Sequence, residues 1–225
     1  MASEPHPIEV TDAQLARLLI AAEPSKARQS HGFVFQSGAS RLLGLYVPAN
    51  YTDEVDAYSI KQPDDDVMRH SFKNMKAGSG VELGDLVRNA EVKRDFVMYV
   101  SFWEEFATNI RRIHVLYIEA DYWRGLFPAD LQPFISATAF AGITNAKSDD
   151  AKWKERRENL QEQWRAARPQ GSLMSVNYKR DHKKQMRVQC AIPAQWFSEV
   201  FRSLFDEART TQLEAALNDQ PVPSV

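Results

Sequence analysis

The chain has 225 residues, of which 44% are hydrophobic and 26% are charged, and this composition is typical of a folded globular protein rather than a disordered or fibrous one. Its single cysteine, Cys190, excludes an intramolecular disulfide and a thiolate cluster for zinc or iron–sulfur. No run approaches the roughly 18 apolar residues of a membrane span, and Met1–Pro7 lacks the blocks of a signal peptide, so we expect a cytoplasmic protein that contacts no membrane.

The first third of the chain predicts a helix, several strands and a second helix. Thr11 and Gln14 form a capping-box pattern ahead of apolar residues at helical spacing, which predicts a helix over 11–22. Short runs rich in β-branched and aromatic residues then predict three strands. These strands span 32–35, 42–47 and 55–60. The acidic run at 63–66 predicts the start of a helix that continues through Phe72.

The middle of the chain predicts a strand that leads into a long buried helix. The apolar run Asp95–Val100 favours the strand. Ser101 and Glu104 then form a second capping-box pattern, followed by apolar residues at spacings of four and three that would carry a helix to about Gly125. These residues are Phe102, Phe106, Ile110, Ile113 and Tyr117. The run Val115–Ile118 also suits a strand, which leaves that alternative open for the second half.

The last part of the chain predicts three helices and a β-hairpin. An apolar helix is expected over 134–143, and a highly charged helix with a narrow apolar stripe over 149–168. Strands at 173–178 and 186–192 flank six polar residues, 179–184, as in a hairpin with a basic tip. Pro193 then begins a helix that continues to Leu217.

Together these elements predict an α+β fold. It would have one antiparallel or mixed β-sheet with a C-terminal basic β-hairpin, covered by several amphipathic helices. We expect a single domain over 11–217, with a flexible N-terminus at 1–10 and a flexible C-terminal tail at 218–225.

Positive charge is concentrated between Ala151 and Cys190. This segment holds eleven basic residues against four acidic ones, a net of +7, whereas the rest of the chain carries −9. Such an asymmetry is what an anionic partner requires of a binding surface. The sequence therefore predicts a non-enzymatic protein that binds DNA or RNA, such as a regulator or an accessory subunit of a nucleoprotein complex.

The predicted nucleic-acid-binding residues come from the hairpin and the charged helix. The hairpin supplies most of the cations for phosphate, and Tyr178 and His182 could stack on a base. The expected phosphate contacts are Lys179, Arg180, Lys183, Lys184, Arg187, Arg156 and Arg157. The same lysines and arginines are equally compatible with a hairpin tip that is simply solvated.

Two other functions remain open at this level. The stripe Trp153, Leu160 and Trp164 could bind a protein partner or a second copy of the chain, which would make this an assembly or adaptor subunit. On the same helix, Lys154 is spaced to pair with Glu158, and Glu162 with Arg165.

The third possibility is an enzyme whose active site is assembled from scattered residues, although no catalytic motif is visible. The glycines of Gly78–Gly84 have no phosphate-loop spacing and indicate a turn, and Asp64–Asp66 with His70 suits a helix start better than a metal site. Cys190 lies between Val188 and Ile192 and should pack as a small hydrophobe. We therefore predict no catalytic residue, no metal and no cofactor.

Overall fold

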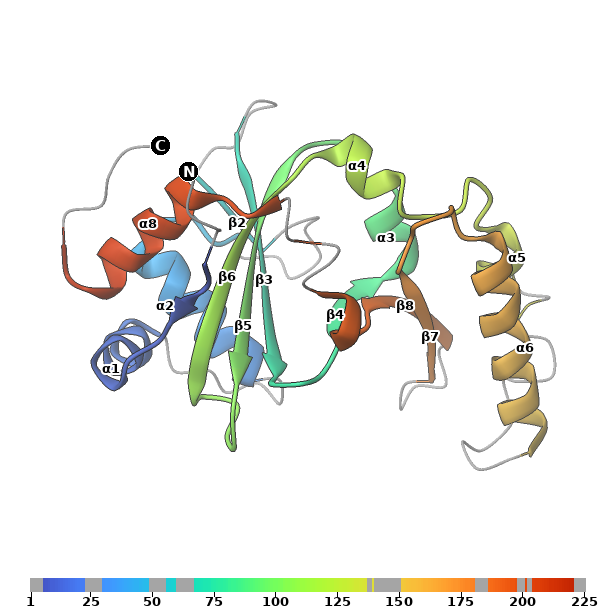
Figure 1. The fold of residues 1–225 in the computed structure, drawn as a ribbon, viewed down its shortest axis with the longest axis horizontal. Helices are drawn as coiled ribbons and strands as arrows, with labels where there is room; N and C mark the ends of the chain where they lie inside the picture. Colours follow the sequence, from blue (N-terminus) through green and yellow to red (C-terminus); the bar gives the residue numbers. More distant parts are fainter. Residues whose placement is uncertain are drawn as a thin grey trace. The chain divides into compact units, whose positions relative to one another are not determined.

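The computed structural model describes residues 6–22, 30–48, 56–59, 67–136, 139, 151–180, 186–197, 201 and 204–220, with the backbone alone at 30–32, 180, 186, 187 and 196. Contacts divide the chain into two compact units. Unit 1 comprises Met1–Ser79, Arg94–Glu119 and Ser198–Val225, and unit 2 comprises Gly80–Lys93 and Ala120–Phe197. Helices and strands occur in both, which confirms the mixed α and β content, but the described residues form two sheets where the sequence predicted one (Figure 1).

Unit 1 contains a five-stranded mixed sheet in the order β1-β6-β5-β3-β2. Its strands are β1 (Ile8–Glu9), β2 (Ala57–Tyr58), β3 (Arg69–Lys76), β5 (Phe96–Trp103) and β6 (Ile110–Ile118). β3 and β5 are parallel, and the other neighbours are antiparallel. β5 is buried on both faces from Phe96 to Ser101, which explains why its sequence is a continuous apolar run rather than an alternation.

Three helices complete the core of unit 1: α1 (Asp12–Ala21), α2 (Ser30–Leu42) and α8 (Glu207–Leu217). Leu18 of α1, Phe35 of α2 and Leu213 of α8 join Val97 and Tyr99 of β5 in one apolar cluster. The predicted capping box of α1 is confirmed, since Gln14 N donates to Thr11 Oγ1 and Thr11 N donates to Gln14 Oε1. α1 and α2 approach closely at Gly38, where a Cβ atom would lie 2.5 Å from the carbonyl oxygen of Leu18.

The three strands and the second helix predicted for the first third of the chain are largely wrong. Residues 32–35 belong to α2, in which Phe35, Ala39 and Leu42 recur at helical spacing and pack in the core. Of 42–47 only Tyr46 makes a β-bridge, to Tyr58, and within 56–59, the described part of 55–60, only Ala57–Tyr58 is a strand. The helix expected through Phe72 is the strand β3 over its described part, while 63–66 lie outside the described residues.

The predicted central helix is also wrong. β5 continues to Trp103, residues 104–109 form a turn with Glu105 at φ 58°, and β6 follows, so the strand alternative left open for Val115–Ile118 is confirmed. Ser101 caps no helix: it is fully buried and donates to Asn74 Oδ1 at 2.8 Å. The predicted strand Asp95–Val100 is confirmed as the first part of β5.

Unit 2 is built around a three-stranded antiparallel sheet in the order β4-β8-β7. Its strands are β4 (Val81–Asp85), β7 (Ser175–Arg180) and β8 (Met186–Ile192). Its helices are α3 (Leu86–Ala90), α4 (Ala120–Arg124), α5 (Gln132–Ile135), α6 (Ala151–Ala167) and the short η1 (Ala194–Trp196). The antiparallel pairing of β7 with β8 agrees with two of the predicted strands. Of the predicted polar tip, 179–184, residues 181–184 lie outside the described residues.

The other predicted helices of this region differ in extent. The charged helix is confirmed as α6, whereas the helix expected over 134–143 is the short α5 in its described part. The helix expected over 193–217 is interrupted: η1 follows Pro193, Phe205 makes a β-bridge with Leu116, and α8 begins only after its N-cap Asp206. Within the part of the chain that the structure describes, no helix combines the length and hydropathy needed to span a bilayer.

Candidate nucleic-acid interface

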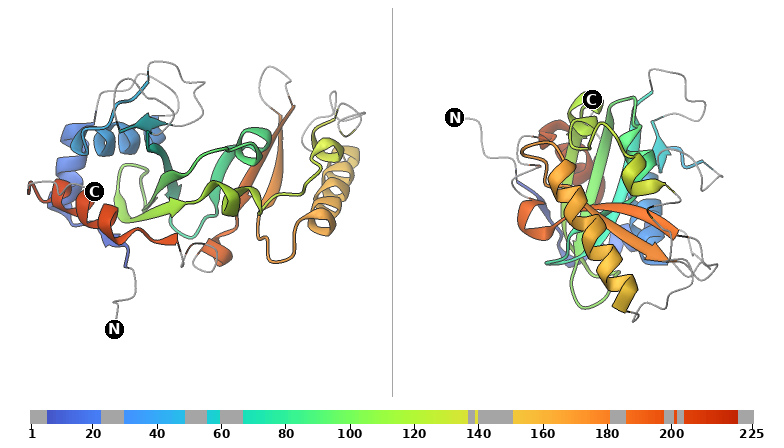
Figure 2. Two further views of the ribbon diagram at one scale, coloured as in Figure 1. Left: turned by 90° about the horizontal axis from the view of Figure 1, so that it is seen from above. Right: turned by 90° about the vertical axis from the view of Figure 1, so that its right-hand side faces the viewer.

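Helix α6 and strand β7 lie side by side in unit 2 (Figures 1 and 2). The indole N–H of Trp164 donates to the carbonyl oxygen of Met174 at 2.9 Å, and the side-chain amide of Gln161 donates to that of Val176 at 3.4 Å. Both acceptors belong to the chain that forms or leads into β7. The two basic elements that the sequence could only treat separately are therefore neighbours.

The predicted phosphate-binding cations of α6 and β7 differ in whether they already bond to other groups of the protein. Arg156 is exposed, and its Nε donates to the carbonyl oxygen of Ala139 at 3.3 Å. Arg157 is half-buried, and its buried Nε has no hydrogen-bond partner among the described residues. Lys179 lies 2.9 Å from both carboxylate oxygens of Glu82 on β4. A phosphate at Lys179 would thus compete with a carboxylate already in place.

The structure describes little of the other predicted phosphate contacts. Lys183, Lys184 and the predicted stacking residue His182 lie outside the described residues, and of Arg180 and Arg187 only the backbone is described. Arg187 stands opposite Lys179 in the ladder, and Arg180 stands opposite Met186. Their backbone positions are thus at the end of the β7–β8 ladder nearest the tip.

Tyr178 faces the core of unit 2 rather than solvent. Its side chain is 3% exposed, and it stands opposite the buried Val188 in the ladder. Burial raises the pKa of its hydroxyl to about 12. Because alternate residues of a strand face opposite sides, Tyr178 shares the buried face with Val176, and its ring is not placed to stack on a base.

The predicted partner-binding stripe is also turned inward. Trp153, Leu160 and Trp164 are 6%, 3% and 1% exposed. Trp164 packs edge-on against Phe134 with ring centroids 5.1 Å apart. The narrow stripe thus serves the internal packing of unit 2, and it offers no exposed anchor to a partner chain.

The ion pairs expected along α6 do not form. Neither Lys154 with Glu158 nor Glu162 with Arg165 makes a salt bridge in the described structure, and the guanidinium of Arg165 has no acidic partner among the described residues. All four side chains are exposed. The positive charge near the end of α6 is therefore less neutralised than its sequence spacing indicated.

A polar pocket of about 300 Å³ lies beside this end of α6, and sequence reasoning missed it. Arg165 and Arg168 line it together with residues of β7 and of η1. Arg168 is held by a hydrogen bond from its Nη1 to the carbonyl oxygen of Met174 at 3.4 Å. The spacing of three residues between two arginines was the only available signal, and it does not show what the helix packs against.

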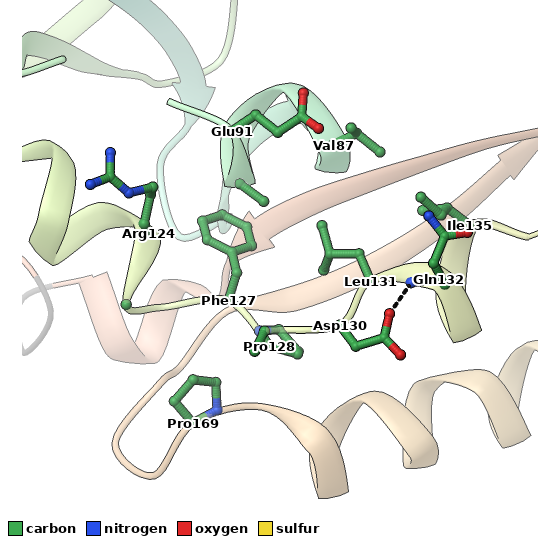
Figure 3. A pocket seen from close by; sticks show the side chains of 13 residues that line it. Val87, Glu91, Arg124, Phe127, Pro128, Asp130, Leu131, Gln132, Ile135 and Pro169 are labelled. Atoms are coloured by element: carbon green, nitrogen blue, oxygen red, sulfur yellow. Dashed lines mark hydrogen bonds between the residues drawn. The ribbon is translucent and has the colours of Figure 1, made fainter. Parts of the chain in front are cut away.

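A larger pocket of about 800 Å³ lies elsewhere in unit 2 (Figure 3). Val87 and Glu91 border it on one side and Pro169 on another, while Phe127 and Leu131 give it an apolar lining. Such a pocket has the size of a small-molecule site, roughly 300 to 1,000 Å³.

Most charged groups of the larger pocket already have structural roles. Arg124 pairs with Asp121 and donates to the carbonyl oxygen of Val92 at 2.8 Å. Asp130 accepts the backbone N–H of Gln132 at 2.9 Å. Glu91, on the opposite side, is an exposed carboxylate. The pocket is lined by both positive and negative side chains, and most of them are already bonded within the protein. Its charge therefore favours neither an anionic nor a cationic ligand, and the pocket gives no functional assignment.

Unit 1 contains a buried hydrogen-bonded cluster around His70. The Nε2 atom of His70 lies 2.9 Å from Ser59 Oγ, and Nδ1 lies 3.3 Å from the hydroxyl of Tyr99. Burial, and secondarily the charge of Arg209, lowers the pKa of His70 to about 4. A serine beside an imidazole can serve nucleophilic catalysis, but a ring with this pKa is a weak base, and Ser59 lines neither pocket described above.

The other residues weighed as catalytic or metal-binding show ordinary packing where the structure describes them. Cys190 is fully buried between Val188 and Ile192, as expected of a small hydrophobe. Gly78 has φ 78° in a turn, but β4 begins at Val81, so only the start of Gly78–Gly84 is a turn. Among the described residues, no three His, Cys, Asp or Glu side chains gather as metal ligands would, and Asp64–Asp66 fall outside them.

The chain matches no protein-family model, no curated protein and no solved structure.

Proposed function

We propose that this protein binds nucleic acid through the basic residues of Ala151–Cys190. It would act without catalysis, as a regulator or an accessory subunit of a nucleoprotein complex. Phosphate contacts come chiefly from Lys183, Lys184 and Arg187 at the hairpin, and Arg156 and Arg157 of α6 extend the surface. Tyr178 is not part of this surface, because its ring is buried.

The observation that carries the proposal is the division of charge between the two units. Unit 2 contains 15 basic and 11 acidic residues, a net of +4, whereas unit 1 contains 13 basic and 19 acidic residues, a net of −6. A basic surface attracts a polyanion, and binding releases counterions from the polyanion, which raises the entropy of the solution. Binding of a polyanion is therefore favoured at unit 2.

The packing of α6 beside β7 supports a composite surface. The hydrogen bonds from Trp164 and Gln161 place cations of the helix and of the hairpin strands on adjoining elements. A surface built from two elements can follow several successive phosphates, which a solvated loop alone could not do. Since the described part of unit 2 carries no visible base-reading motif, backbone contacts would dominate and sequence preference would be weak.

Reversing the charge of two hairpin lysines tests this proposal. In Lys183→Glu/Lys184→Glu, we expect the affinity for labelled single-stranded DNA to fall at least tenfold. The slope of log K against log salt should decrease in magnitude by about 1.4 to 1.8, because each of the two lost phosphate contacts removes ~0.7 to ~0.9 from it. Fluorescence anisotropy over a salt series, repeated with duplex DNA and RNA, measures both quantities and ranks the substrates.

The matched control is Lys76→Glu/Lys93→Glu, which changes the net charge equally at two exposed lysines outside the basic segment. It should keep most of the affinity. Equal losses in both double variants would show that net charge rather than this surface governs binding. If the unmodified protein binds none of the three nucleic acids at low salt, the proposed function is wrong and an acidic protein partner becomes the candidate.

A further inference from the structure

The small pocket at the end of α6 is a built polar site. Gln161, Trp164, Arg165 and Arg168 line it from the helix, Ser175 and Val176 from β7, and Pro193 and Gln195 from the chain after β8. The segments that form it are distant in sequence, so it exists only in the folded unit. Trp164, 1% exposed, gives it a rigid wall.

Several of its polar groups are already committed to the protein. Gln161 donates to Val176, Ser175 Oγ donates to the carbonyl oxygen of Ala191 at 2.9 Å, and the indole of Trp164 donates to Met174. These bonds fix the frame of the pocket. The groups without a described partner are the guanidinium of Arg165 and the side-chain amide of Gln195, and Arg168 keeps donors beyond the one bonded to Met174.

The described lining of the pocket is positively charged. Among the described residues that line it there are two arginines and no carboxylate. Like charges three residues apart on a helix repel each other, and Glu162, the acid spaced to relieve Arg165, does not pair with it. An anion placed between the two arginines would remove this repulsion and supply acceptors to their free donors.

We propose that this pocket binds one phosphate group, held by Arg165 and Arg168 with Gln195 as an additional donor. The planar guanidinium presents parallel N–H donors that match two phosphate oxygens, and it keeps its charge at any physiological pH. A volume of about 300 Å³ leaves space for the group attached to the phosphate. That this group is part of a nucleic acid rests on the function proposed above, whereas binding of phosphate itself does not.

Inorganic phosphate is the first probe. In isotope-labelled protein, two-dimensional NMR should show a saturable shift of the Trp164 indole and Gln195 amide signals on titration with phosphate at constant ionic strength. The Arg165→Gln/Arg168→Gln variant should lose this shift. Arg165→Gln alone, which removes an exposed side chain and should fold normally, should weaken phosphate binding about tenfold, the effect of losing one charge-assisted hydrogen-bond donor.

The control is Lys152→Gln/Lys154→Gln, which removes two charges from exposed positions of the same helix that do not line the pocket. It should retain the shift. If phosphate gives no saturable shift in the unmodified protein, or if both double variants respond alike, the pocket is not a phosphate site.

Oligonucleotides with and without a terminal phosphate identify the source of the group. Tighter binding of the phosphorylated strand, lost in Arg165→Gln/Arg168→Gln, assigns the pocket to a strand end. Equal binding of both strands, weakened in this variant more than in the lysine control, assigns it to the internal backbone. If phosphate shifts the pocket signals but no oligonucleotide binds, the pocket serves a small phosphate compound, and the nucleic-acid function alone is overturned.

Discussion

We expect Trp164→Ala to lower the free energy of unfolding of unit 2 by about 3 to 5 kcal/mol, the usual cost of truncating a buried tryptophan. The ring is 1% exposed, packs edge-on against Phe134, and donates its N–H to the carbonyl oxygen of Met174. Truncation leaves a cavity and weakens the hydrogen bonding between α6 and the chain leading into β7. Chemical denaturation followed by circular dichroism and by tryptophan fluorescence measures the loss.

Two substitutions on the same helix separate packing from helix propensity. Gln163→Ala, at an exposed position, should change stability by no more than about 0.5 kcal/mol. Trp164→Phe keeps an aromatic ring but loses the N–H donor, so its loss of stability should lie between those of Gln163→Ala and Trp164→Ala. A loss below about 1 kcal/mol for Trp164→Ala would mean that α6 contributes little to unit 2, and the composite surface would then lose its structural basis.

Mild acid should destabilise unit 1 through two buried histidines. Burial lowers the pKa of His70 to about 4, with a smaller contribution from Arg209, and burial with the charge of Arg112 lowers that of His114 to about 4. In the unfolded chain a histidine titrates near 6.5. Below that pH the unfolded state takes up protons that the folded state excludes until about pH 4.

The sign of the effect follows from this difference. Full stability is present above pH 6.5 and declines as the pH falls toward 4, by about 2 kcal/mol for each ring at pH 5. Urea denaturation at pH 7 and pH 5, at constant ionic strength, should therefore show a combined drop of about 4 kcal/mol, before most carboxylates titrate.

Comparing a variant of a buried histidine with a variant of an exposed one tests which imidazole rings cause the loss of stability at low pH. His114 contacts the rings of Phe102 and Phe205, so His114→Phe keeps an apolar ring and should halve the drop between pH 7 and pH 5. His6→Gln, at an exposed position, is the control and should leave the drop unchanged. A pH dependence that survives intact in His114→Phe would show that its ring is not buried as a neutral group.

The sequence predicted single elements well where a local signal and the tertiary packing agree. The capping box of α1 and the stripe of α6 are such cases. The central region failed because Phe102, Phe106, Ile110 and Ile113 imitate a helical repeat, although Phe106 is 71% exposed in a turn. A strand buried on both faces shows no alternation of apolar and polar residues. The sequence pattern therefore could not distinguish this strand from a buried helix.

The candidate interface was predictable as a segment but not as a surface. Counting charges identified Ala151–Cys190, since charge density needs no knowledge of the fold. The packing of α6 against β7 involves tertiary hydrogen bonds, such as that from Trp164 to Met174, which a sequence does not show. Tyr178 was predicted to stack on a base, but its ring lies on the buried face of its strand. The pocket at Arg165 and Arg168 depends on three separate segments, which explains why no local pattern indicated it.

The chain passes from unit 1 to unit 2 and back twice, and the last return brings α8 to the core of unit 1. Leu213 and Leu217 of α8 pack in the same cluster as Leu18 of α1. During synthesis, every residue of unit 2 therefore leaves the ribosome before unit 1 can close its core. Until α8 is available, the core of unit 1 lacks Leu213 and Leu217, so apolar residues such as Leu18 are incompletely buried and prone to aggregation.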